Sequence, residues 1–265
     1  VRSGAAAHAQ EVLGQMPPRV PTCRLAVLIP DKYFPLTGAP FQRRLAQEVC
    51  SAAAQRGFEA VIVPTPPGNQ AALARSLVRN YDAAFLEQMQ PENLALVFHL
   101  TESRFPVLLF NRHIPGLQAP SLNTDDYGAA RTLARIMTDH GHRNLCMLST
   151  THYESMLGDH GPAEGWLDYL QEARLTDGCV LPLAYGKKGR SVEVLEKLLA
   201  LRPRITALVL YLPTLLADMR EHPVLRRLRV PEELSIATTG SMNGIAVPSG
   251  FPPITSFEID WNRAG

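Results

Sequence analysis

The sequence has few cysteines, no long apolar run and almost no net charge. Its four cysteines, Cys23, Cys50, Cys146 and Cys179, form no C-x-x-C pair, which argues against a zinc site or a redox motif and favours a reduced, cytosolic setting. No stretch of 18 apolar residues that could cross a membrane occurs. The 26 Lys and Arg nearly balance the 25 Asp and Glu. No net field therefore draws the chain to phosphate backbones or anionic membranes, and we expect no membrane partner.

Motifs for catalysis are also missing. The segment GSMNG at 240–244 has its serine second rather than central, so it is not a nucleophile elbow. The segment YGKKGRS at 185–191 lacks the spacing of a phosphate-binding loop. In PEELS at 231–235 the carboxylates are neighbours on a turn and do not face each other as an acid/base pair must. The sequence therefore predicts no enzyme, no catalytic residue and no cofactor.

Short apolar runs alternate with amphipathic stretches along most of the chain, which spans 265 residues with 46% apolar composition. RLAVLIP at 24–30 reads as a buried strand, and Phe41, Leu45 and Val49 then recur at helical spacing. This rhythm is typical of parallel sheets covered by helices on both faces. It occurs twice, so we predict an α/β protein with two doubly wound parallel-sheet subdomains.

The predicted boundaries follow the changes in composition. Residues 1–20 have linker or hinge-remnant composition, 21–120 form an N-terminal subdomain, and 121–249 form a C-terminal subdomain. We expect about 250–265 to rejoin the N-terminal subdomain. The last residues, DWNRAG, look like the opening of a helix, and the chain starts without methionine, so we expect further sequence at both ends.

The stretch TDHGHRNLCML, 138–148, holds two histidines one residue apart. Gly141 falls just after a periodic helix, where a left-handed cap favours glycine, and His140 lies in the final turn. A histidine pair alone lacks the four ligands that a structural zinc site needs. We therefore predict a helix end and no metal site. At the start of the same helix we expect Thr124 to be the cap, with Asp125 and Asp126 in the first turn.

Residues 105–149 combine several features in order. They contain a strand that ends in Asn-Arg at 111–112, the segment SLNTDD at 121–126 leading into a helix, and Gly-His-Arg at 141–143 before another apolar strand. In this combination the segment closely resembles the effector-binding core of lactose/galactose-repressor-type (LacI/GalR) bacterial transcription regulators. A weaker similarity extends over 24–258.

The resemblance implies a periplasmic-binding-protein-like fold with a ligand cleft between the two subdomains. It implies a transcriptional regulator, such as a repressor, that is a cytoplasmic homodimer and senses a small-molecule effector, sugar-like or less polar. Binding would control a DNA-binding headpiece, of the helix-turn-helix or winged-helix kind, that is not present in this chain. DNA would be a partner only through that absent N-terminal domain. The segment AAAHAQEVLG at 5–14 lacks the family's hinge-helix pattern, so both a helix-turn-helix with an aberrant hinge and a winged helix stay open for that domain.

Three positions that usually anchor the effector differ from the family pattern. Proline replaces the family's arginine at Pro162, ahead of Gly165-Trp166, which removes a bidentate donor. Leu212-Pro213 replaces an Asn-Asp pair, and TTGS at 238–241 replaces Gly-Phe-Asp-Asp. The C-terminal half of the cleft therefore lacks its charged groups, and a typical sugar should bind poorly.

The candidate ligand contacts lie in loops after strands and at helix starts, where α/β folds bind ligands. They are Tyr33, Phe34, Phe41, Asn111, Asp125, His152, Trp166, Tyr211 and Ser241. For several of them a structural role is an alternative. Phe41 fits the core stripe of its helix, Asn111 suits a turn, Asp125 suits a first helical turn, and His152 is equally compatible with a solvated loop.

Two other classes of function remain open from the sequence. A periplasmic solute-binding protein of a transport system shares the fold, and a secretion signal upstream would distinguish it from a regulator. No group of residues in the sequence supports an enzyme on the same open sheet, and a fold alone does not establish a reaction.

Overall fold

The computed structural model describes residues 21–87, 93–114, 116–150, 161–183, 205–219, 228–242 and 250–260, with isolated positions 193, 196, 199, 223, 245 and 247. The described chain divides into two compact units. One comprises the residues up to Asn123, and the other runs from Thr124 to Asp260. Each unit holds one parallel sheet, so the prediction of two parallel-sheet subdomains is confirmed.

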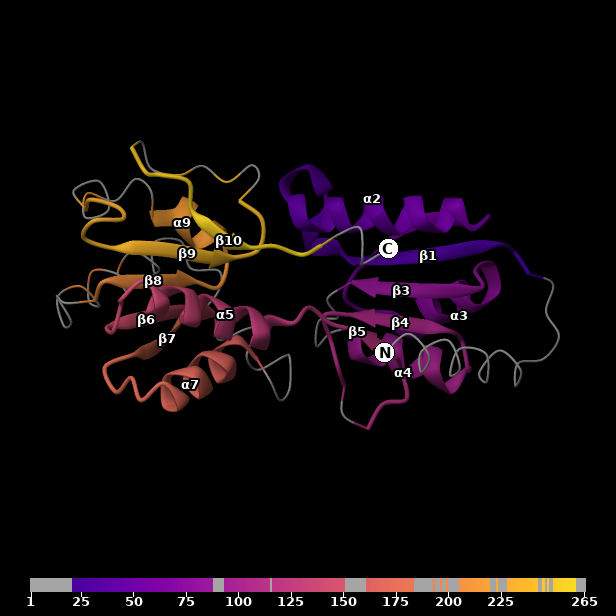
Figure 1. The fold of residues 1–265 in the computed structure, drawn as a ribbon. Helices are drawn as coiled ribbons and strands as arrows, with labels where there is room; N and C mark the ends of the chain where they lie inside the picture. Colours follow the sequence, from indigo (N-terminus) through magenta and orange to yellow (C-terminus); the bar gives the residue numbers. More distant parts are fainter. Residues whose placement is uncertain are drawn as a thin grey trace. The chain divides into compact units, whose positions relative to one another are not determined.

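The sheet of the first unit has the strand order β2-β1-β3-β4-β5, with every pairing parallel. Its strands are β1 (Arg24–Pro30), β2 (Glu59–Thr65), β3 (Ala83–Glu87), β4 (Val107–Phe110) and β5 (Ser121–Leu122). The helices are η1 (Asp31–Tyr33), η2 (Leu36–Gly38), α2 (Pro40–Gln55), α3 (Gln70–Asn80) and α4 (Leu94–Glu102). Figure 1 shows α2 above β1, and α3 and α4 below it.

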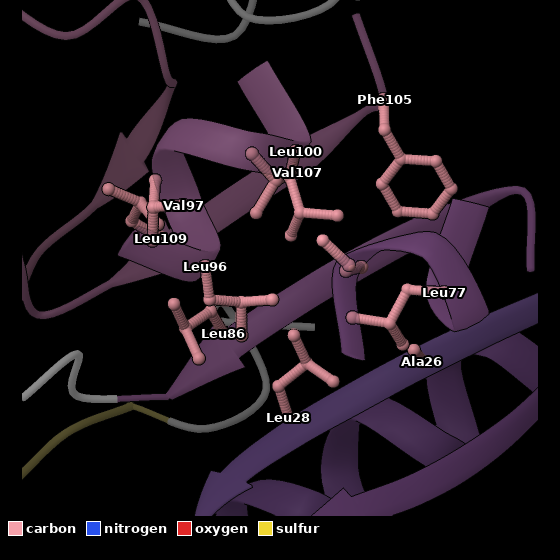
Figure 2. Packing of buried hydrophobic residues seen from close by; sticks show 12 residues of the cluster. Ala26, Leu28, Leu77, Leu86, Leu96, Val97, Leu100, Phe105, Val107 and Leu109 are labelled. Atoms are coloured by element: carbon pink, nitrogen blue, oxygen red, sulfur yellow. The ribbon is translucent and has the colours of Figure 1, made fainter. Parts of the chain in front are cut away.

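Alternate residues of each strand pack on opposite faces of this sheet, as the period of two requires. Val27, Phe85 and Phe110 pack with α2 on one face. Ala26, Leu86 and other apolar residues pack with α3 and α4 on the opposite face, and Figure 2 shows this cluster at close range. The sheet is therefore covered on both sides, and its polar residues gather at the strand ends.

The sheet of the second unit has the order β10-β9-β8-β6-β7, again wholly parallel. Its strands are β6 (Leu145–Thr150), β7 (Cys179–Leu183), β8 (Ala207–Leu210), β9 (Ser235–Thr239) and β10 (Thr255–Phe257). The helices are α5 (Asp126–Asp139), α7 (Pro162–Glu172) and α9 (Thr214–Met219). The buried residues of α5 and α7 pack on one face of the sheet, and those of α9 on the other. Because β10 pairs with β9, the segment we predicted to rejoin the first subdomain belongs to the second sheet at 255–257.

Helices α5 and α7 are held together at their surface by two polar contacts. The Tyr127 hydroxyl donates to Asp168 Oδ2 at 2.7 Å, and the Arg131 guanidinium donates to both carboxylate oxygens of Glu172 at 3.1 and 2.6 Å. Where the helices approach most closely, a Cβ on Gly165 would lie 2.3 Å from the Tyr127 carbonyl oxygen. Glycine at 165 is therefore a packing requirement of this helix pair.

The Gly-His-Arg motif ends helix α5 as predicted. Gly141 has φ +89°, its N–H donates to Thr138 O at 2.9 Å, and the N–H of His142 donates to Met137 O at 3.1 Å. These two bonds define a Schellman cap. The His142 ring bridges Thr206 Oγ1 at 2.9 Å and Ser235 Oγ at 3.0 Å, so it joins the residue before β8 to the first residue of β9. Burial lowers the pKa of His142, which favours its neutral form.

The start of α5 differs in detail from the prediction. The capping side chain is Asp125, whose Oδ1 accepts from Gly128 N–H at 2.8 Å, and Thr124 instead donates to Asp126 Oδ2 at 3.0 Å. Asp126 lies in the first turn, and Asp125 precedes it as the N-cap, so both negative charges lie at the end of the helix that the dipole favours.

Candidate functional site

The carboxyl edge of the first sheet has a topological switch point between β1 and β3. From β1 the chain crosses to β2 on one side, and β3 pairs with β1 on the other side. Open parallel sheets bind ligands at such a point, beyond the carboxyl ends of the strands. The residues placed there are η1 (Asp31–Tyr33), directly after β1, and Glu87, the last residue of β3.

Glu87 is a buried carboxylic acid at the end of the central strand. Its side chain has no exposed surface and lies on the α2 face, two residues after Phe85. Gln42 Nε2, from the first turn of α2, donates to Glu87 Oε1 at 3.2 Å. Burial raises the pKa of Glu87 to about 7, against the opposing effects of the Gln42 hydrogen bond and the charges of Lys32 and Arg112. Glu87 can therefore change its charge near neutral pH.

The opposite face of the same edge carries a second buried polar pair. Asn93, directly before α4, donates from Nδ2 to Thr65 Oγ1 at 2.9 Å, and both side chains are buried. Thr65 is the last residue of β2. Polar groups are thus buried on both faces of the sheet at its carboxyl edge, whereas the strand interiors are apolar.

Aromatic rings lie on the same α2 face as the acid, and Phe110 is the register partner of Glu87 in the sheet. The Phe110 ring lies 6.3 Å from Phe41 and 5.7 Å from Phe85, measured between centroids. Lys32 Nζ lies 5.1 Å from the centroid of the Tyr33 ring. Aromatic faces beside hydrogen-bonding groups suit a ligand that has both a flat or apolar face and polar substituents.

The carboxyl edge of the second sheet has polar groups that bond to one another. The Tyr211 hydroxyl, after β8, donates to Asp126 Oδ2 at 2.9 Å, and the Thr124 hydroxyl donates to the same oxygen at 3.0 Å. The Thr239 hydroxyl donates to the Tyr211 carbonyl. Burial raises the pKa of Asp126, and the two hydrogen bonds oppose this effect. Asp126 and Tyr211 thus have a structural role within this unit.

Four predicted contact residues lie at the carboxyl edge of the first sheet. Tyr33 and Phe41 are partly buried against the α2 cluster, so the core-stripe alternative for Phe41 holds at least in part. Phe34 is exposed. Asn111, directly after β4, has φ +51°, a backbone conformation that asparagine tolerates better than most residues. Asn111 is therefore the turn residue that the alternative described, and it also lies at the edge where a ligand would bind.

The predicted contacts of the second unit lie in different surroundings. Asp125 is the N-cap of α5, and Tyr211 is almost fully buried and bonded to Asp126. Ser241 follows Gly240 after β9 and is partly buried. His152 lies outside the described residues. Trp166 requires a correction, because it packs among the core residues of α5, α7 and the sheet, and its one donor, Nε1, is already bonded to Cys179 O at 3.1 Å.

The sequence reasoning missed the buried polar residues at the first edge. Glu87 was assigned to the apolar run DAAFLEQ, and Gln42, Thr65 and Asn93 carried no motif. One signal was available, because a charged residue that ends a buried parallel strand lies where such sheets bind ligands. Within the described residues, no group of three or more His, Cys, Asp or Glu side chains could hold a metal ion, and no helix is both long and apolar enough to span a bilayer.

No protein-family model and no curated protein sequence matches the chain. Solved structures do match. The transcriptional regulator CelR in complex with cellobiose is 20% identical, with a TM-score of 0.73 over 98% of this chain and 79% of that chain. A LacI family transcriptional regulator from Bifidobacterium animalis subsp. lactis is also 20% identical, with a TM-score of 0.73 over 91% and 85% of the two chains.

A third match is the lac repressor dimer bound to operator and the anti-inducer ONPF, which is 13% identical, with a TM-score of 0.70 over 97% of this chain and 85% of that chain. The chain has the LacI-type core fold. The two doubly wound sheets of that fold are the α/β units predicted from the sequence. The three matched proteins named here are transcriptional regulators.

Proposed function

We propose that this chain is the effector-sensing and dimerisation core of a LacI-type transcriptional regulator. A small molecule binds at the carboxyl edge of the first sheet and controls DNA binding by a headpiece outside the chain. The observation that carries the proposal is the group of buried polar side chains at the carboxyl edge of the first sheet, Gln42, Glu87 and Arg112, in a fold shared with regulators. Burial of polar side chains costs free energy, and a ligand that bonds to them would offset that cost.

The proposed effector is small, with an apolar or ring face and several hydrogen-bonding groups. The aromatic cluster around Phe110 supports the first property, and Glu87 with Asn111 supports the second. CelR binds cellobiose, so a sugar-like ligand is our first choice. Leu212 and Pro213 replace the family's Asn-Asp pair after β8, so this chain relies on the first sheet for polar recognition.

The remaining parts of the proposal follow from the same likeness. The lac repressor structure is a dimer on operator DNA, which supports a homodimer that reaches DNA through a domain outside this chain. We propose a cytoplasmic, non-enzymatic protein, by analogy with the lac repressor, whose matched structure is bound to operator DNA.

A thermal-shift screen against sugars, sugar acids, nucleobases and glycans tests the proposal. A ligand present at about 100 times its Kd should add about 2.7 kcal/mol to the free energy of unfolding. Asn111→Gly keeps the positive φ but removes the amide, and we expect it to weaken binding by about tenfold, which is about 1.4 kcal/mol.

Arg104→Gly is the matched control for Asn111→Gly. Arg104 also has a positive φ, +51°, but it is exposed and precedes β4, at the amino edge of the same sheet. The control should bind the ligand as the wild type does. A screen in which no compound raises the melting temperature would contradict the proposal, as would equal binding by Asn111→Gly and the wild type.

A further inference from the structure

Glu87 has one carboxylate oxygen that other side chains satisfy and one that they do not. Oε1 accepts from Gln42 Nε2 at 3.2 Å. Oε2 is buried, and no hydrogen bond reaches it from the part of the chain that the structure describes. A buried acceptor without a donor lowers the stability of the folded chain, so its presence at a ligand-binding edge calls for an explanation.

The position of Glu87 points to a ligand. It ends β3, the middle strand of the sheet, beside the switch point where ligands bind to parallel sheets. A residue needed only for packing would be apolar here, like Phe85 and Phe110 on the same face. The Gln42 hydrogen bond to Oε1 fixes the orientation of the carboxylate, and it therefore also fixes the direction in which Oε2 points.

The neighbouring charges restrict the group that can meet Oε2. Lys32 and Arg112 act on Glu87 through their positive charges, so a ligand cation would be repelled by two side chains. A ligand anion would be repelled by the carboxylate oxygen and has no hydrogen to donate to it. A hydroxyl or an amide N–H donates a hydrogen bond without either cost.

We propose that Glu87 is a specificity-determining residue of the effector site, whose Oε2 accepts a hydrogen bond from an uncharged O–H or N–H group of the ligand. This inference rests on the proposed function and names the residue that selects the ligand. A donor at Oε2 favours the ionised carboxylate, so binding is linked to loss of a proton from Glu87. Because burial holds the pKa of Glu87 at about 7, this linkage falls in the neutral range.

The linkage has a definite sign. Because Gln42 donates to Oε1, the proton of the neutral form lies on Oε2, and the ionised form is the stronger acceptor there. The ionised population rises from about one tenth at pH 6 to about nine tenths at pH 8 for a pKa near 7. The apparent affinity should therefore be roughly tenfold weaker at pH 6 than at pH 8.

The experiment is calorimetric titration of the full chain with cellobiose, maltose, adenine and glucuronate at pH 6, 7 and 8. We expect at least one of the uncharged probes to bind the wild type, and to bind more tightly at pH 8. Glu87→Gln should fold, because it removes a buried ionisable group and keeps the shape. Its amide would face the ligand's donor with an N–H, so we expect at least tenfold weaker binding at pH 8 and no pH dependence.

Glu59→Gln is the control, since Glu59 is the exposed first residue of β2 at the opposite edge of the sheet. It should bind as the wild type does. Equal, pH-independent binding by Glu87→Gln and the wild type would overturn this inference and leave the proposed function standing. Binding of glucuronate alone would overturn the inference in the same way. No binding of any probe by the wild type would count against both.

Discussion

Replacing Trp166 with alanine should lower the free energy of unfolding of the second unit by about 3–5 kcal/mol, because it removes a large, fully buried side chain from a packed core. The indole has no exposed surface and lies among residues of α5, α7 and the sheet. It also satisfies the Cys179 carbonyl through Nε1 at 3.1 Å. Urea unfolding followed by circular dichroism measures the change.

Two further variants separate packing from ligand contact at this position. Trp166→Phe keeps most of the packing and loses the donor, so it should cost about 1–2 kcal/mol. Leu167→Ala, on the exposed side of the same helix, should change stability by less than about 0.5 kcal/mol. Trp166→Phe should bind the effector as the wild type does. A large loss of affinity with unchanged stability would show that Trp166 contacts the ligand, as the sequence suggested.

Gly165→Ala should lower the free energy of unfolding by about 3 kcal/mol, at the upper end of the usual range for overpacking. The new Cβ would lie 2.3 Å from the Tyr127 carbonyl oxygen and 2.9 Å from its carbonyl carbon. These atoms are backbone, so the clash is relieved only by moving α7 away from α5. Such a movement would also stretch the Arg131–Glu172 and Tyr127–Asp168 contacts.

Gly161→Ser is the matched control, four residues earlier at the N-cap of α7. A Cβ at Gly161 meets nothing within 4 Å, its φ of −74° is accessible to any residue, and serine is a good N-cap. Stability should stay within about 0.5 kcal/mol of the wild type or rise slightly. If Gly165→Ala were as stable as this control, the close approach of α5 and α7 would be wrong.

The fold was predictable because each parallel strand is a nearly continuous apolar run. RLAVLIP became β1, and four of its seven residues, Ala26 to Ile29, have no exposed surface. The glycine that ends α5 was also predictable, since the Schellman cap depends on local backbone geometry alone. The strand and the helix cap both depend on residues that are close together in the sequence, so the sequence alone reveals them.

The site was harder to predict, because it depends on which strands meet at an edge. Glu87 and Gln42 are 45 residues apart, and only the order β1-β3 and the placement of α2 bring them together. Trp166 was misplaced for a similar reason. A helix position near a family motif does not tell which face of the helix enters the core, and Trp166 faces the core with Leu170. Tyr211 likewise lies at a strand end but is bonded to Asp126.

Hydrogen exchange read by mass spectrometry, with the ligand that stabilises the chain most, tests the central claim most directly. The claim is that the effector binds at the carboxyl edge of the first sheet. We expect ligand-dependent protection in peptides that cover Asp31–Tyr33 and 110–112, and none in the turns at 56–58 and 103–105 of the amino edge. Protection at the amino-edge turns, or at neither edge, would contradict the account.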